Sequence, residues 1–150
     1  LPDKGDPVFL YSIETSLQLH ITEISEALRE LYVAAYTLPT TAEYINVNTA
    51  KKLQQLFAEY LPDATEKDFY EMASCGITRN FMAKPCSMYF TIEDKISRYL
   101  SCCLTLYHVP EKKQLDTIDS ILNMDLRTIA ETLIKNTIAR AEKGFESVGI

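Results

Sequence analysis

The chain contains two histidines, and neither stands in a pattern that predicts catalysis or metal binding. His20 falls within an apolar periodic stretch, and His108 precedes the Val-Pro pair of an expected turn. The sequence holds no nucleophile elbow, glycine-rich phosphate loop or H-E-x-x-H motif. These residues therefore favour a protein that acts by binding and is not an enzyme.

Three glutamates could form a carboxylate cluster, because Glu23, Glu26 and Glu30 follow one another at steps of three and four residues. A di-iron bundle would need Glu-x-x-His pairs facing inward, and the sequence has none. The glutamates are therefore predicted to form a solvated acidic face, with no metal bound.

The cysteines are Cys75, Cys86, Cys102 and Cys103, and they form no C-x-x-C motif. Their spacing favours reduced thiols and a cytoplasmic protein. A net charge of −6 argues against nucleic acid as a partner. No apolar run reaches the roughly 20 residues that a membrane span needs.

The apolar periodicity predicts one all-α domain over residues 1–150, with a disordered N-terminus at 1–6. One apolar stripe runs from Phe9 to Leu31, as one helix or as two joined near His20, and the stretch ends at Leu38-Pro39.

Further helices are expected to begin near Asn48, after the N-cap Thr65, at Pro85 and at Pro110, with a bend at Gly76. The total is five or six helices. The last two are expected to be long and antiparallel, in a globin-like layout, with a plain up-and-down bundle as the alternative. Residues 140–150 are predicted to fray.

Residues 75–89 carry a distinctive spacing: Gly76 is followed nine residues later by Pro85 and thirteen residues later by Tyr89. This run resembles the proximal segment of bacterial sensor globins, in which a histidine three residues after the glycine binds haem iron. Here that position is Arg79, which stays protonated and offers iron no lone pair.

The resemblance covers roughly residues 45–135. Residues 52–57 are similar to the distal helix of these globins, and residues 118–129 are similar to the end-helix pattern of globin-coupled sensors. Met124 and Thr128 replace two leucines of that pattern.

Because Arg79 stands in place of the haem-binding histidine, the resemblance is to the haem-free members of this family. These include the amino-terminal domains of stressosome regulators and the sporulation-inhibitory sensor-domain proteins of Bacillus. The resemblance implies a homodimer without haem that binds a fatty acid, with a halide ion, and that regulates a sporulation or stress histidine kinase pathway.

A globin cavity without porphyrin must collapse or take up an apolar ligand. The candidate lining residues are Phe57, Phe81, Met82, Ile92 and Ile96. Each of them also fits an ordinary core. Arg79 is the candidate to hold a carboxylate or small anion, with a surface arginine as the alternative. The candidate dimer residues are Leu104, Tyr107, Leu115 and Ile118.

Three other functions remain open at this point. The chain could be a helical interaction module that binds another protein through an exposed apolar stripe and takes no small molecule. It could be an enzyme, although the sequence contains no recognisable set of catalytic residues. It could also bind haem through His20 or His108 as an unusual ligand.

Overall fold

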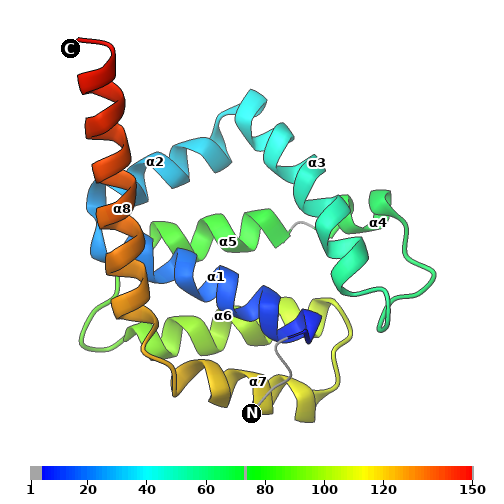
Figure 1. Cartoon of the computed structure of the whole chain (residues 1–150). Helices are drawn as coiled ribbons and strands as arrows, with labels where there is room; N and C mark the ends of the chain where they lie inside the picture. The colour runs from blue at the N-terminus through cyan, green and yellow to red at the C-terminus, as the bar shows by residue number, and fades with distance from the viewer. Residues whose placement is uncertain (1–4, 73, 150) are drawn as a thin grey trace.

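The computed structural model describes residues 5–72 and 74–149, and in these ranges it consists of eight α-helices and no strand (Figure 1). The predicted all-α class is confirmed, whereas the expected number of five or six helices is wrong. The helices are α1 (Pro7–Ile24), α2 (Glu26–Thr37), α3 (Pro39–Leu56), α4 (Glu66–Glu71), α5 (Ser74–Ala83), α6 (Ile92–Leu106), α7 (Glu111–Leu122) and α8 (Leu126–Ser147).

The first apolar stretch forms two helices, so the two-helix alternative is confirmed, with the break at Ser25. The Ser25 hydroxyl accepts a hydrogen bond from the Leu28 N–H at 3.2 Å and so caps α2. Asp6 caps α1 by accepting from the Val8 N–H at 3.0 Å. The remainder of the predicted disordered N-terminus, apart from Gly5, lies outside the described residues.

The helix expected near Asn48 begins nine residues earlier, at Pro39. Proline has no N–H to lose at a first helical position, and its fixed φ suits the helix, so Pro39 both ends α2 and begins α3. The predicted cap at Thr65 is confirmed as a capping box with Asp68. Helix α4 ends at Glu71, ahead of the bend expected at Gly76, and Gly76 itself lies inside α5.

Pro85 does not begin a helix. It lies in the loop between α5 and α6, where the Ser87 N–H donates to the Phe90 carbonyl at 2.9 Å. Thr91 and Asp94 form a second capping box, with both hydrogen bonds at 3.2 Å, and this box sets the start of α6.

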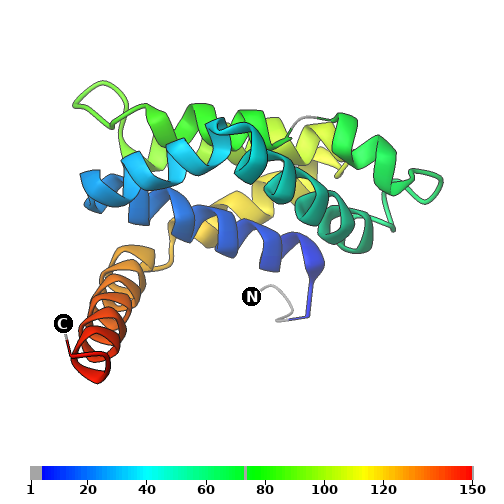
Figure 2. The same ribbon diagram turned by 90° about the horizontal axis from the view of Figure 1, so that it is seen from above.

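The long helix expected after Pro110 is divided at residues 123–125, where Asp125 caps α8. Helix α7 runs back along α6, and α8 then turns away and packs on α1 (Figures 1 and 2). The last two helices therefore are not the long antiparallel pair that was predicted. Helix α8 continues to Ser147, so most of the segment expected to fray is helical.

The core surrounds α1 and joins it to α3, α6 and α7. Phe57 stacks on Tyr107 with ring centroids 4.5 Å apart, and Tyr11 meets both rings edge-on. In the described ranges, no helix is both long enough and apolar enough to cross a membrane.

A buried charge fixes the loop between α5 and α6. Lys95 is 1% exposed, and its Nζ donates to Glu23 at 3.3 Å and to the Lys84 carbonyl. Both Glu23 carboxylate oxygens accept from the Cys86 N–H at 3.1 Å. Burial would raise the pKa of Glu23, but the hydrogen bonds from Cys86 and the charge of Lys95 outweigh it, so this pKa is lowered.

Replacement of Glu23 by Gln should destabilise the fold by about 3 kcal/mol, because Lys95 would lose its counter-charge while staying buried. Since the pKa of Glu23 is lowered in the folded state, its contribution is present at neutral pH and is lost as the pH falls through that pKa. Urea unfolding at neutral and acid pH measures both effects.

The matched control is Glu131→Gln, which removes a carboxylate from an exposed pair with Arg127 and should cost at most ~0.5 kcal/mol. Equal unfolding midpoints for the two variants would contradict a stabilising role for the Glu23–Lys95 pair.

Candidate functional site

Two adjoining hollows lie beside α3 and α5. Residues of α1, α2 and α6 complete the inner one, and residues of α2 and α4 complete the outer one. The inner one has a volume of about 100 Å³ and the outer one about 290 Å³. Both are lined by Tyr36, Thr49 and Cys75, so they meet at these residues.

The inner hollow ends at a chain of buried hydroxyl groups. The Tyr99 hydroxyl lies 2.8 Å from Thr78 Oγ1 and 3.3 Å from the Tyr11 hydroxyl. Burial raises the pKa of Tyr99 and that of Tyr11 well above their ordinary range, so both phenols are neutral at physiological pH. This wall can therefore offer hydrogen-bond donors without carrying charge.

Burial also raises the pKa of the neighbouring Cys103 thiol, to about 11. The Cys75 thiol lies at the junction of the two hollows, and burial raises its pKa as well. Both groups are therefore protonated near neutral pH and are weak nucleophiles. The thiols consequently favour binding over covalent chemistry at this site.

Away from the hydroxyl chain, the walls of the hollows include charged, polar and apolar side chains. Lys52 of α3 pairs with Glu14 of α1, and both are exposed at the rim of the inner hollow. The outer hollow is lined by Ala50 and Phe69 and also by the polar residues Asn46, Thr49 and Tyr70, with Gly76 at one side. A Cβ atom built on Gly76 would meet nothing within 4 Å. Both hollows thus have mixed polar and apolar walls, and the outer one is the wider.

The predicted lining residues do not surround one space. Phe57, Met82 and Ile96 are buried in the core. Phe81 and Ile92 are partly buried against that core, and the Phe81 ring meets Tyr99 edge-on at 5.6 Å. The two hollows are lined by other residues, so the core alternative describes these five side chains better.

Arg79 does not face the hollows. Its Nε donates to Thr37 Oγ1 of α2 at 2.7 Å, and it lines a separate groove between α2 and α5. Arg79 is one turn farther along α5 than Cys75, and its side chain is bonded to α2. The prediction that its guanidinium faces the internal pocket is therefore corrected.

The predicted dimer residues are mostly unavailable. Leu104 and Tyr107 are fully buried within the chain, and Ile118 is nearly so. Leu115 is 59% exposed and is the one candidate of the four that could contact a second copy.

Neither histidine lines the hollows. His20 is half-buried in a groove with Glu23 and Arg127, and burial lowers its pKa. His108 lies in the turn before α7, with a positive φ of 60°. An imidazole ligand for haem iron is thus not positioned in this site. Over the described residues, no group of three His, Cys, Asp or Glu side chains could hold a metal ion.

Sequence reasoning missed Tyr11, Thr78 and Tyr99 as site residues. A usable signal was present, because Tyr99 falls in the apolar stripe of its helix, and a buried phenol needs a polar partner. The identity of that partner depends on which helices cross, which periodicity does not show.

Comparison of the chain with protein-family models, with characterised proteins and with solved structures finds no match among any of them. The relation to sensor globins stays a prediction from the sequence. Function is therefore inferred from the geometry of the hollows.

Replacement of Tyr99 by Phe should destabilise the fold by about 1–2 kcal/mol, because the ring still fills its place while the hydroxyl bonded to Thr78 and Tyr11 is removed. Chemical denaturation measures the change. The control is Tyr89→Phe at an exposed position, with a change within about 0.5 kcal/mol. An unchanged midpoint for Tyr99→Phe would mean that the hydroxyl chain adds no stability.

Proposed function

We propose that this chain is a haem-free sensor domain that binds a small amphiphilic molecule in the two hollows. The observation that carries the proposal is the pairing of neutral hydroxyl groups at the inner end with a wider outer space that Ala50 and Phe69 line in part. Ligand sites in general combine apolar walls with a few convergent polar groups.

The ligand class that fits best is a fatty acid of short or medium length. Its carboxylate would accept a hydrogen bond from a phenol of the Tyr11–Thr78–Tyr99 chain, and its alkyl chain would pass Cys75 into the outer hollow. A halide ion could take the place of the carboxylate, since it also accepts hydrogen bonds. The volumes of about 100 and 290 Å³ suit a smaller ligand than porphyrin.

Helix α1 provides a route from the site to the surface. It lines the inner hollow through Tyr11 and Gln18, and it supports the first turns of α8. A ligand that binds one arrangement of α1 more tightly shifts the population toward that arrangement. Regulation of a sporulation or stress kinase pathway in the cytoplasm is the output that we propose from the sequence resemblance.

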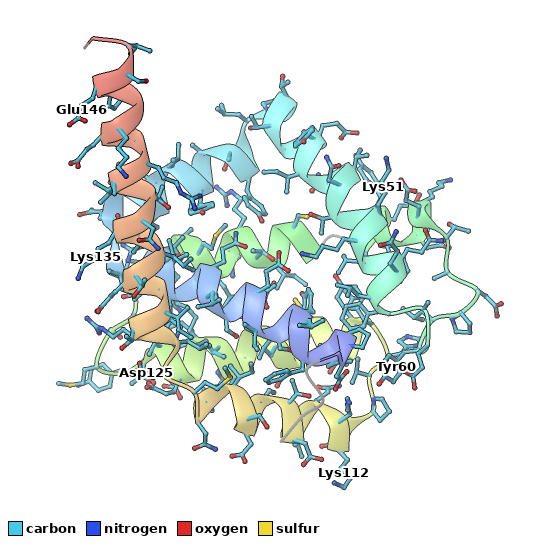
Figure 3. All side chains as sticks on the ribbon, viewed as in Figure 1. Lys51, Tyr60, Lys112, Asp125, Lys135 and Glu146 are labelled. Atoms are coloured by element: carbon cyan, nitrogen blue, oxygen red, sulfur yellow. The ribbon has the colours of Figure 1, made fainter. Side chains whose placement is uncertain are left out.

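The distal half of α8 is the surface that we assign to a homodimer. Lys135 and Glu146 mark this half, which stands clear of the other helices (Figure 3). The described residues from 135 onward are exposed. They include Ile138, which is 53% exposed, and Phe145, which is 56% exposed. A second copy would cover these apolar side chains.

The same exposed face favours a second candidate function. A helical interaction module without a small-molecule ligand would also present an apolar stripe to another protein. The two candidates differ in whether the hollows are occupied, so a test at Gly76 separates them.

Replacement of Gly76 by Leu should abolish ligand binding while leaving the fold intact, because the new side chain enters the open outer hollow. Leucine is also the better helix former, by about 0.5–1 kcal/mol.

The wild-type protein should release a fatty acid into an organic extract, detected by mass spectrometry. Added decanoate should raise its melting temperature.

The control is Gly144→Leu, an equally open helical glycine in α8, which should gain the same helix propensity and keep the ligand. Decanoate should also slow alkylation of Cys75 and leave that of the exposed Cys102 unchanged. Clean extracts, with no thermal shift in the wild type, would favour the interaction module.

Replacement of Ile138 and Phe145 together by Asp should convert a dimer to a monomer, because two charges would be placed in the proposed α8 interface. Sedimentation velocity at micromolar concentration measures this change. Leu115→Asp tests the alternative surface on α7 and should leave the dimer intact. A monomeric wild type, or dissociation by Leu115→Asp alone, would contradict the assignment to α8.

A further inference from the structure

A third hollow lies on the outer side of α5, as a groove of about 480 Å³ between α2 and α5. Its apolar walls come from Val33, Ala34 and Leu38 of α2 and from Ala83 of α5. Arg29 and Arg79 line it as well. The proposed ligand site does not use this groove, and α8 does not form part of its lining.

Arg79 is held in place without a counter-charge. Its Nε is fixed by the hydrogen bond to Thr37 Oγ1 at 2.7 Å. Within the described ranges, no carboxylate forms an ion pair with it, although the chain has 21 acidic residues. The planar guanidinium therefore retains terminal N–H groups for an external carboxylate.

Arg29 adds a second fixed cation. Its side chain is 16% exposed, and one terminal nitrogen donates to Glu23 at 3.5 Å. Its Nε is buried and has no hydrogen-bond partner among the described residues. Glu30 also lines the groove and is exposed, so an incoming carboxylate is favoured near Arg79 and disfavoured near Glu30.

The groove is open along its length, because Ala34, Thr37, Leu38 and Ala83 are all exposed. A small molecule would normally have most of its surface buried in its site. An amphipathic helix can instead lay one apolar face in such a groove and keep its other face in water. The shape therefore favours a helical segment over a small ligand.

We propose that the groove between α2 and α5 docks an acidic amphipathic helix of another protein. The apolar face of that helix covers Val33, Leu38 and Ala83, and one of its carboxylates pairs with Arg79. This pairing supplies specificity in a chain whose overall charge of −6 would otherwise repel an acidic partner. The proposal does not depend on the ligand hollows.

The test uses a synthetic helical peptide of about four turns, with leucines along one face and glutamates beside them, and a matched peptide with glutamine at those positions. The glutamate peptide should bind the full chain and shift the NMR signals of Val33, Ala34 and Ala83. Arg79→Gln should weaken this binding at least about tenfold and leave the weaker binding of the glutamine peptide unchanged.

Arg127→Gln is the matched control, since it removes an exposed arginine on α8 and should not change binding. If Arg79→Gln does not fold, Arg79→Lys keeps the charge without the planar fork and should weaken binding several-fold. Three results would each overturn the proposal: equal binding of the two peptides, signal shifts confined to other surfaces, or no binding of the glutamate peptide at about millimolar concentration.

Discussion

The fully buried hydroxyl of Tyr99 must find hydrogen-bond partners, and the arrangement of the helices around the hollows depends on where it finds them. Tyr99 belongs to α6, and its partners Thr78 and Tyr11 belong to α5 and α1. Desolvation makes an unpaired phenol expensive, so these three helices cannot separate at this level without breaking the chain of bonds. The same groups form the polar end of the inner hollow. One set of residues thus both holds the core together and offers donors to a ligand.

A second buried polar contact lies one turn earlier on the same face of α6. Lys95 binds Glu23 of α1 and the Lys84 carbonyl, and Glu23 in turn binds the Cys86 N–H. The loop between α5 and α6 is thereby fixed to the end of α1. Near the start of α1, Asp6 pairs with Lys113 of α7. Helix α1 is consequently anchored along its length, which suits an element that lies between the hollows and α8.

The sequence predicted structural features that depend on neighbouring residues along the chain. It did not predict features that depend on which helices cross one another. The all-α class and the Thr65 cap follow from local periodicity and local hydrogen bonds, and both are confirmed. Pro39 ends the first stretch as predicted, although it also begins α3. Pro85 was misplaced because proline suits a first helical turn and a loop equally well, and the Thr91 capping box decided the start of α6. Arg79 was predicted to face an internal pocket but contacts α2, because a helical period does not show which helix lies opposite.

Helix α5 relates the two proposed binding surfaces to each other. Thr78 contributes to the hydroxyl chain of the inner hollow, and the next residue, Arg79, lies in the groove against α2. A rotation or shift of this ten-residue helix would change both surfaces together, because its backbone moves as one unit. If a ligand draws Thr78 toward its head group, the Arg79–Thr37 hydrogen bond must lengthen or α2 must follow. Occupancy of the hollow and affinity for an acidic helix would then be linked, and the linkage would be reciprocal.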